Sequence, residues 1–256
     1  METELIWTSA ARTDVGLVRA INEDACLDRP ERGLWAVADG MGGHAAGDVA
    51  SRMVVETLAS LSAPDSLEDY VDAARDALDV ANRRLRHEAA SRHVRTIGTT
   101  VAVCLACGRR CAMLWAGDSR VYLYRDARLA QLTRDHSAVE EMRSQGYLSA
   151  EEALHHPAQH LITRAVGAAD ELELDETVVD VRDGDLFLLC SDGLTNEASD
   201  AEIAEVLACG DCEQATHSLI ELALRAGARD NVSAIVVRAE DPVTTDKTLV
   251  NPSIAR

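Results

Sequence analysis

Lysine is almost absent from this 256-residue sequence, whose single lysine is Lys247, near the C-terminus. The lysine of a P-loop, a Schiff-base lysine and the strand lysine of a protein kinase therefore have no candidate. The cations available for chemistry are arginine, histidine or a bound metal.

Positive charge and aromatic side chains are also scarce. The chain has 25 basic residues against 44 acidic ones, and the resulting charge of −19 repels DNA, RNA and anionic lipid surfaces. One Phe, three Trp and four Tyr are spread along the chain and form no evident platform for stacking bases. We therefore expect neither a nucleic-acid partner nor a membrane partner.

Long apolar runs are missing as well. None approaches the roughly 18 residues that a membrane helix needs, and the N-terminus carries acids where a signal peptide carries bases. We expect a cytoplasmic monomer. The hydrophobic and charged fractions are ordinary for a globular protein, which favours a single domain over residues 1–240. Residues 241–256 lose all periodicity and are expected to form a loose tail.

Seven cysteines raise the question of a zinc site. Cys104 and Cys107 form one C-x-x-C pair with Cys111 just beyond, and Cys209 and Cys212 form another. The first group lies in an alternating strand and its turn, whereas the second lies at a helix end far along the chain. We favour ordinary reduced thiols, and a four-thiolate zinc site is the alternative.

Periodicity places helices and strands in alternating groups. Helical patterns cover residues 45–61, 200–208 and 212–226. A further helical pattern begins at Ser66 and runs to Leu85. Strand patterns cover residues 97–106, 111–117, 119–124, 127–132 and 232–237. We also predict a hairpin around Asp183-Gly184, formed by strands at 174–181 and 185–190. Helix pairs around antiparallel strands predict an α+β layered domain. The polar segment 136–165 fits poorly into the layers and is expected to be an excursion over one edge.

The stretch VADGMGGH, residues 37–44, has three glycines directly after an acid. Its spacing lacks the last glycine of the dinucleotide fingerprint, and no Gly-Lys-Ser/Thr follows it. A tight turn between a strand and a helix explains the glycines. The acid, Asp39, is the more informative residue.

Four aspartates lie where apolar strands meet loops, namely Asp39, Asp118, Asp192 and Asp230. A single Asp at such a junction usually caps or turns the chain. Four together repel one another strongly at the edge of a core unless divalent cations neutralise them. Oxygen ligands suit Mg²⁺ or Mn²⁺, and two such ions about 4 Å apart can activate a water for attack on phosphorus. The pattern favours metal-assisted phosphoester hydrolysis.

Phosphate also needs a fixed counter-charge. Arg19 lies four residues before Glu23 and Asp24 in the stretch RAINED, where an arginine fork can hold phosphate oxygens and an acid can orient metal-bound water. Taken alone, this stretch is more typical of a solvated turn.

Together these stretches resemble the ordered motifs of the metal-dependent protein serine/threonine phosphatases, the PPM or type 2C family, in its bacterial form. The resemblance covers residues 12–238. Its motifs are RAINED (19–24), VADGMGGH (37–44), TIGTT (96–100), AGDSR (116–120), LTRDHS (132–137), ITRAVG (162–167), CSDGLTN (190–196) and ARDNVS (228–233). The stretch TDVGLVRAINEDACLDRPERGLW is also similar to stand-alone proteobacterial members associated with type VI secretion, which oppose a threonine kinase.

The resemblance implies a four-layer α-β-β-α sandwich with two central antiparallel sheets and flanking helix pairs. It implies two Mn²⁺ or Mg²⁺ ions that activate a water to hydrolyse phosphoserine and phosphothreonine on proteins, opposing a Ser/Thr kinase. By position, Asp39 bridges the ions, the Gly40 carbonyl binds one of them, and Asp192 and Asp230 hold the other.

The remaining roles also come from the resemblance. Glu23 and Asp24 act through metal-bound water, and Arg19 binds the substrate phosphate. Asp118 joins Asp192 around a third, weaker ion. The segment 136–165 corresponds to the flap beside the cleft, where substrates are discriminated.

The sequence departs from many eukaryotic members at one position. They carry a histidine directly after Asp-Gly that is proposed to protonate the leaving alkoxide, whereas this chain has Met41 there. His44, three residues on, is a candidate general acid, and a metal-bound water or a purely structural role for His44 are the alternatives.

Two other functions compete with protein dephosphorylation. A pseudo-phosphatase that binds phosphoproteins without turnover normally lacks a metal ligand, and every expected acid is present here. A phosphatase of small molecules or nucleotides on the same scaffold is the second rival. Its discrimination from a protein phosphatase requires comparing turnover of a phosphothreonine peptide with that of nucleotides.

Overall fold

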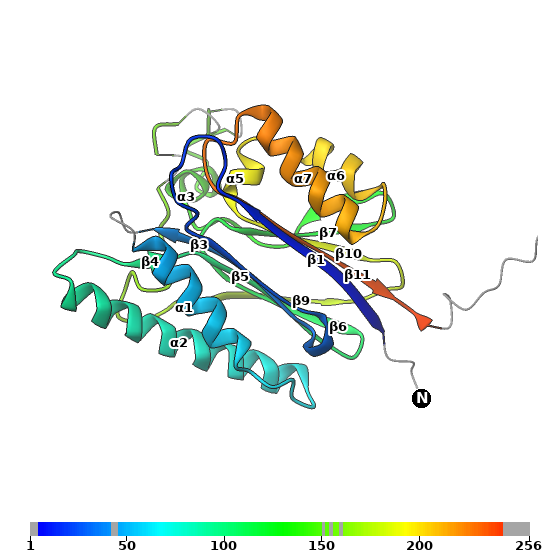
Figure 1. Ribbon diagram of the computed structural model, residues 1–256, viewed down its shortest axis with the longest axis horizontal. Helices are drawn as coiled ribbons and strands as arrows, with labels where there is room; N and C mark the ends of the chain where they lie inside the picture. The colour runs from blue at the N-terminus through cyan, green and yellow to red at the C-terminus, as the bar shows by residue number, and fades with distance from the viewer. Residues whose placement is uncertain (1–4, 42–45, 150–151, 154–155, 159–160, 243–256) are drawn as a thin grey trace, which may run out of the picture.

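The computed structural model describes residues 5–41, 46–149, 152–153, 156–158 and 161–242. Two antiparallel sheets pack face to face between two pairs of helices (Figure 1). The helices of one outer layer are α1 (Gly47–Ala59) and α2 (Leu67–Ser91), and those of the other are α6 (Asp200–Leu207) and α7 (Cys212–Ala226). This arrangement confirms the predicted α-β-β-α sandwich.

Among the described residues, one sheet has five strands and the other has six. The first sheet contains, in spatial order, β1 (Ile6–Asp14), β11 (Val232–Glu240), β10 (Leu186–Cys190), β7 (Arg120–Arg125) and β8 (Arg128–Gln131). The second contains β2 (Asp24–Arg29), β3 (Leu34–Met41), β5 (Val101–Cys107), β6 (Arg110–Ala116) and β9 (Asp175–Asp180), and β4 (Gly98–Thr99) pairs with the end of β3. The described part of the chain also includes short elements, among them a 3-10 turn (Pro30–Arg32), α3 (Ala138–Ser144) and α5 (Asp192–Thr195).

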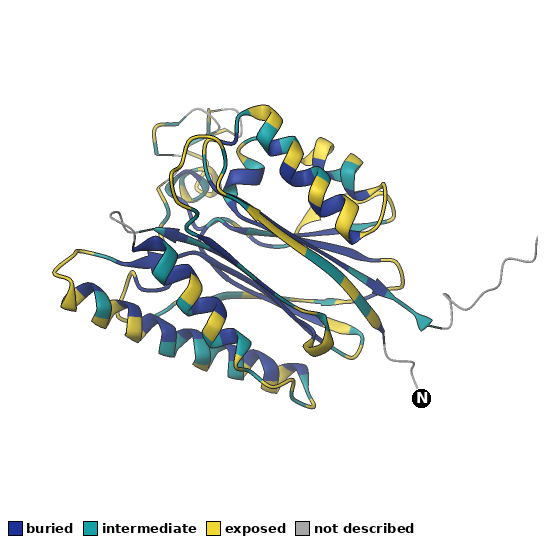
Figure 2. Cartoon of the chain, in the orientation of Figure 1, coloured by how far each residue is buried: buried dark blue, intermediate teal, exposed yellow. Residues whose placement is uncertain are grey.

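The central strands are apolar on both faces because each face packs against a different layer. In β3, Trp35 and Val37 belong to the core between the two sheets, whereas Leu34, Ala36 and Ala38 pack toward α1 and α2. Figure 2 shows these strands as a buried band between the half-exposed helices. The period of two in side-chain direction therefore divides one apolar run between two cores.

The helix predictions are confirmed with small shifts at the ends. Ser66 caps α2 by accepting a hydrogen bond from the backbone N–H of Asp69, and the apolar inner face of the helix, which includes Leu67, Leu78 and Leu85, is buried. In α1 the buried side is centred on Ala50, Val54 and Leu58.

The predicted hairpin around Asp183-Gly184 is wrong. The strand β9 is an edge strand of the six-stranded sheet, whereas β10 lies in the middle of the five-stranded sheet. A second crossing separates β6 from β7 at Gly117, whose φ is +118°. A turn signal marks a reversal of the chain but does not specify the partner, and in a sandwich the next strand can join the opposite sheet.

Two strands escaped the sequence patterns. The edge strand β1 is half-exposed along most of its length, and β2 begins within the motif that contains Asp24. Together they place Asp24 inside the sandwich and leave Arg19, five residues earlier, at its exposed rim.

The two ends of the excursion at 136–165 lie side by side. An isolated bridge joins Ser137 to Ile162, and the N–H of Thr163 donates to the carbonyl of His136 over 2.8 Å. Of the tail predicted at 241–256, residues 243–256 lie outside the described residues.

Candidate active site

Two carboxylates lie directly opposite each other at one end of the six-stranded sheet. Asp24 on β2 is the cross-strand partner of Asp39 on β3. Like charges in this position destabilise a sheet unless protons or cations neutralise them. This pairing is the centre of the candidate site.

Asp24 is buried and half of its carboxylate lacks a partner. Its Oδ2 accepts hydrogen bonds from the hydroxyls of Ser191 (2.8 Å) and Ser233 (2.7 Å), whereas its buried Oδ1 has no hydrogen-bond partner. Burial raises the pKa of Asp24 to about 7, the two serine hydroxyls oppose the rise, and the charges of neighbouring acids add to it. The free Oδ1 is available to a proton or to a cation with its water.

Asp39 has a fixed backbone and a buried carboxyl. Its N–H donates to the hydroxyl of Thr100 (3.1 Å), and its carbonyl accepts from the hydroxyl of Thr99 and the N–H of Thr100. Burial raises the pKa of Asp39 well above its ordinary value, with further contributions from four acids. Those acids are Asp24, Asp192, Asp118 and Asp230. The structure thus brings the three other predicted strand-end aspartates within electrostatic reach of Asp39.

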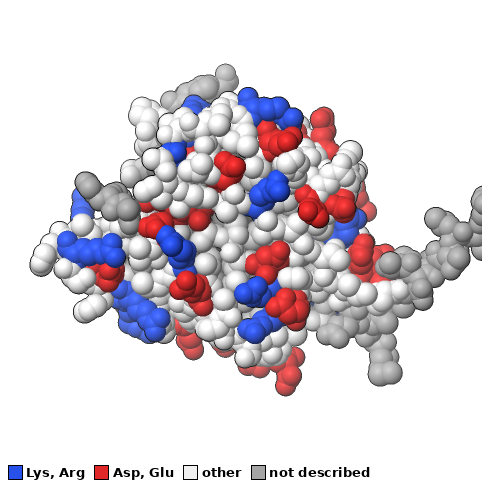
Figure 3. Space-filling view, in the orientation of Figure 1, with Lys and Arg blue, Asp and Glu red and all other residues white. Residues whose placement is uncertain are grey.

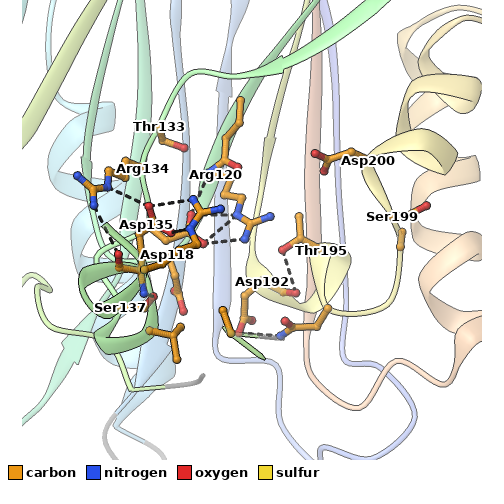
Figure 4. A pocket seen from close by; sticks show the side chains of 17 residues that line it. Asp118, Arg120, Thr133, Arg134, Asp135, Ser137, Asp192, Thr195, Ser199 and Asp200 are labelled. Carbon is orange, nitrogen blue, oxygen red and sulfur yellow. Dashed lines mark hydrogen bonds and ion pairs between the residues drawn. The ribbon is translucent and has the colours of Figure 1, made fainter. Parts of the chain in front are cut away.

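Asp118 and Asp192 form the side of the site that faces the five-stranded sheet. Asp118 follows β6, and burial and the charge of Asp192 raise its pKa to about 8. Asp192 begins α5, and its Oδ2 accepts from the side-chain amide of Asn196 over 3.0 Å. Both acids line a cavity of about 710 Å³ (Figure 4).

An arginine closes one wall of that cavity. Arg120 holds Asp135 through both carboxylate oxygens, at 2.9 Å and 2.7 Å, and also donates to the hydroxyl of Tyr122. Figure 4 shows this pair beside Asp118 and across from Asp192. The positive charge of Arg120 opposes the rise in the pKa of Asp118.

Arg19 and Asp230 form an ion pair at the rim. The guanidinium Nη2 of Arg19 lies 2.7 Å from Asp230 Oδ2, and about half of the Arg19 side chain is exposed (52%). An exposed pair of this kind holds its partners weakly. The guanidinium therefore stands next to the acids while remaining accessible to an anion from solvent.

Asn231 is a positioning residue that the sequence patterns missed. Its buried side chain accepts from the N–H of Glu23 (2.8 Å) and donates to the carbonyls of Val15 (2.9 Å) and Ile21 (3.0 Å). These bonds fasten the loop that carries Arg19 to the start of β11. The motif ARDNVS contains the residue, but no local pattern indicates that it reaches a loop more than 200 positions away.

Glu23 and Gly40 tie the site to the start of α1. Glu23 Oε1 accepts from the N–H of Gly47 over 3.1 Å, where the helix dipole favours a carboxylate. The carbonyl of Glu23 accepts from the N–H of Gly40 (3.1 Å). A Cβ at Gly40 would stand 2.1 Å from the Gly47 carbonyl oxygen, so only glycine permits this approach.

His136 holds the base of the excursion. Its Nδ1 accepts from the N–H of Gly117 (3.2 Å), which leaves Nε2–H to donate to Asp175 Oδ2, also at 3.2 Å. Its ring stacks on that of Trp115. Burial lowers the pKa of His136. The residue positions the turn that leads into Asp118.

The donor set of this edge fits hard divalent cations better than zinc. Carboxylate and carbonyl oxygens dominate, several carboxyl pKa values are raised by burial and by the charges of neighbouring acids, and Asp24 Oδ1 is an unsatisfied buried acceptor. Among the described residues, no three His, Cys, Asp or Glu side chains are already arranged as a metal cage. Ions bound here would take waters and the Gly40 carbonyl in addition to carboxylates.

Two other predictions concern residues in or near this region. No disulfide joins the described cysteines, which lie in separate layers: Cys104 and Cys111 lie between the sheets, whereas Cys212 begins α7 and contacts β1. His44, the candidate general acid, lies outside the described residues. No helix in the described part of the chain combines the length and apolarity needed to cross a bilayer.

Known proteins are similar to this sequence over most of its length. PstP of Mycobacterium tuberculosis, a serine/threonine protein phosphatase, is 40% identical over 238 residues, which are 93% of this chain and 46% of PstP. PhpP of Streptococcus pneumoniae, a protein phosphatase, is 36% identical over 233 residues, which are 88% of this chain and 94% of PhpP. The chain therefore spans about half the length of PstP and most of the length of PhpP.

Solved structures have the same fold. PppA, described as a key regulatory component of T6SS in Pseudomonas aeruginosa, superposes with a TM-score of 0.87 at 46% identity, over 93% of this chain and all of PppA. The catalytic domain of PstP in complex with two manganese ions gives a TM-score of 0.85 at 39% identity, over 93% of this chain and all of that one. The family model for protein phosphatase 2C matches residues 18–224. This chain belongs to the protein phosphatase 2C family.

Proposed function

We propose that this chain hydrolyses phosphoserine and phosphothreonine monoesters of proteins at the edge that carries Asp24 and Asp39. The observation that carries the proposal is the group of mutually repelling aspartates beside an accessible arginine. Repulsion of this kind is relieved by divalent cations, and a phosphate ester brings the negative charge that the arginine receives. One phosphatase domain, residues 1–240, carries the activity.

The proposed ligands follow the family pattern at the positions described above. Asp39 and the Gly40 carbonyl would hold one Mn²⁺ or Mg²⁺ ion, and Asp39 with Asp192 and Asp230 would hold a second. When bound, such ions supply a water nucleophile at neutral pH and neutralise charge on the phosphoryl group. The manganese ions in the PstP catalytic domain support this assignment. Asp118 with Asp192 is the proposed place of a third ion.

The chain's own residues hold and orient the reactants. Arg19 leaves Asp230 and grips two phosphate oxygens in a fork, which aligns the phosphorus with the acids below it. Glu23 and Asp24 orient water, because one is anchored at the start of α1 and the other keeps Oδ1 free. His44 is the proposed acid for the leaving alkoxide.

The proposed partners are phosphoproteins and the Ser/Thr kinase whose action the chain reverses in the cytoplasm. PstP and PhpP, both phosphatases by name, support phosphoprotein substrates. The 46% identity to PppA makes phosphorylated components of a type VI secretion system the first substrates to test. The proposed active form is a monomer.

The test is phosphate release from a phosphothreonine peptide in EDTA, in Mg²⁺ and in Mn²⁺. Activity that requires metal and falls at least a hundredfold in Asp39→Asn supports the proposal. Asp76→Asn, at an exposed position on α2, is the matched control and retains full activity. A folded protein that binds the peptide in Mn²⁺ without releasing phosphate would instead be a phosphoprotein-binding pseudo-phosphatase. Faster turnover of nucleotides than of the peptide would favour the small-molecule phosphatase.

A further inference from the structure

A basic surface covers the C-terminal part of α2 and the turn after it. Arg83, Arg84, Arg86, Arg92 and Arg95 are all exposed, and the exposed His87 and His93 lie between them. We refer to these seven residues as the α2 basic surface. Figure 3 shows Lys and Arg atoms gathered at the left end of the molecule, where α2 ends in Figure 1.

This concentration of charge is unusual for this chain. The protein has a formal charge of −19, yet five of its 25 basic residues fall between positions 83 and 95. The only acid in that interval is Glu88. A local excess of positive charge on an acidic molecule therefore defines one place where an anionic partner is attracted.

The helix dipole does not account for Arg83, Arg84 or Arg95. Cations favour a helix C-terminus only within its last turn, and the last turn of α2 contains no basic residue. Arg83 and Arg84 precede that turn, and Arg95 follows the helix altogether.

Internal ion pairs neutralise only part of the surface. Arg86 pairs with Asp170 and Arg92 pairs with Glu88. Arg83, Arg84 and Arg95 form no ion pair with any residue that the structure describes. These three guanidinium groups keep their hydrogen-bonding capacity for a partner.

A chain of contacts links the border of the α2 basic surface to the candidate active site. Asn82, at its border, accepts from the N–H of Gly167 (2.6 Å) and donates to the carbonyl of Ala169 (3.0 Å). The adjacent Val166 bridges to Thr99 of β4, whose hydroxyl donates to the carbonyl of Asp39. In Figure 1, α2 ends on the same side of the molecule as β3, the strand that carries Asp39.

We propose that the α2 basic surface docks an acidic or multiply phosphorylated stretch that flanks the phosphorylated residue of the substrate protein. The inference rests on the proposed phosphatase function and adds a substrate class to it. An acidic chain repels an acidic substrate as a whole, so capture of that substrate needs a local surface of opposite sign. The three unpaired arginines supply charge and forked donors for carboxylates and phosphates.

The test compares two phosphothreonine peptides that differ only in their flanks, one rich in glutamate and one rich in alanine. The triple variant Arg83→Gln, Arg84→Gln, Arg95→Gln removes three charges, and glutamine suits a helix at the two positions within α2. We expect its kcat/KM for the glutamate peptide to fall about tenfold through KM at low salt. The alanine peptide and p-nitrophenyl phosphate should be turned over as before.

A control variant separates the surface from net charge. Arg29→Gln, Arg128→Gln, Arg182→Gln removes the same number of charges from exposed positions at the opposite end of the sheets. It should leave the preference for the glutamate peptide intact. High salt should abolish the difference between the two triple variants, because screening shortens the reach of surface charges.

Each alternative outcome has a separate meaning. The docking proposal would be overturned if the unmodified protein used both peptides equally, or if the α2 variant still preferred the glutamate peptide. In either case, turnover of p-nitrophenyl phosphate would still support the phosphatase function. If no substrate is hydrolysed, binding of the fluorescent glutamate peptide in EDTA still tests the surface, and equal affinity for both triple variants overturns it. If the unmodified protein binds phosphatidylserine vesicles, the α2 variant does not, and peptide kinetics are unchanged, the surface binds membranes and the docking proposal is overturned.

Discussion

Asp24 should make the stability of the metal-free protein depend on pH in an unusual direction. Its carboxyl is buried opposite Asp39, with one oxygen unpartnered, and burial raises its pKa from 3.8 to about 7. The substitution Asp24→Asn keeps the shape of the side chain and removes its titration. Because the amide resembles the protonated acid, the variant should behave as if Asp24 were always neutral.

The sign of the effect follows from where the proton is bound. Between pH 4 and pH 7 the folded protein keeps a proton on Asp24 that the unfolded chain has released. The contribution of Asp24 to the free energy of unfolding therefore falls as pH rises across this window, and this contribution levels off above pH 7. One proton corresponds to about 1.4 kcal/mol per pH unit, so the loss from pH 5 to pH 7 is roughly 2–3 kcal/mol. In thermal unfolding this is on the order of 5–10 °C.

The assay is guanidinium unfolding in EDTA at pH 5, 6, 7 and 8, for the unmodified protein and for Asp24→Asn. The unmodified protein should lose roughly 2–3 kcal/mol relative to the variant between pH 5 and pH 7. The lowered pKa of His136 gives the opposite trend, with stability lost as pH falls, and this trend is common to both proteins and cancels. Parallel curves for the two proteins would refute the reasoning, and Asp76→Asn should follow the unmodified protein throughout.

Three further substitutions test how the site is held. Arg19→Ala should raise KM for phosphopeptide and for p-nitrophenyl phosphate by about tenfold or more with a smaller change in kcat, and an unchanged KM would count against phosphate binding. Asn231→Ala leaves the Glu23 N–H and two loop carbonyls without partners, so thermal unfolding should show a loss of about 2–4 kcal/mol. Gly40→Ala forces Gly47 away, and calorimetric titration should show weaker Mn²⁺ binding although every carboxylate is intact, whereas unchanged affinity would contradict the close approach.

Local patterns succeeded where one segment carries the whole signal. The inner face of α2 and its Ser66 cap follow from residues within a few positions of each other. The apolar strand β3 was recognised for the same reason, and its burial on both faces agrees with its central place. Strand β1 was missed because an edge strand with polar, half-exposed residues has little alternation to detect.

Local patterns could not predict which strands pair with each other. The stretches 174–181 and 185–190 have the composition and turn of a hairpin, yet they join opposite sheets. The choice depends on which sheet offers an apolar face and an open edge, and both are properties of the assembled sandwich. The same holds for the basic residues after Arg83, whose significance depends on how few acids the fold brings near them.

The sequence by itself determined which side chains are available for chemistry. Aspartates at strand ends, an arginine before an acid pair and the near absence of lysine are facts of residue type and local spacing, and they indicated oxygen-bound divalent metals and phosphate. Only the tertiary structure decided that Asp24 lies opposite Asp39, that Ser191 and Ser233 hold one of its oxygens, and that Asn231 anchors the arginine loop. Those contacts join positions up to about 200 residues apart, and the order of strands in the two sheets, which no local pattern encodes, brings them together.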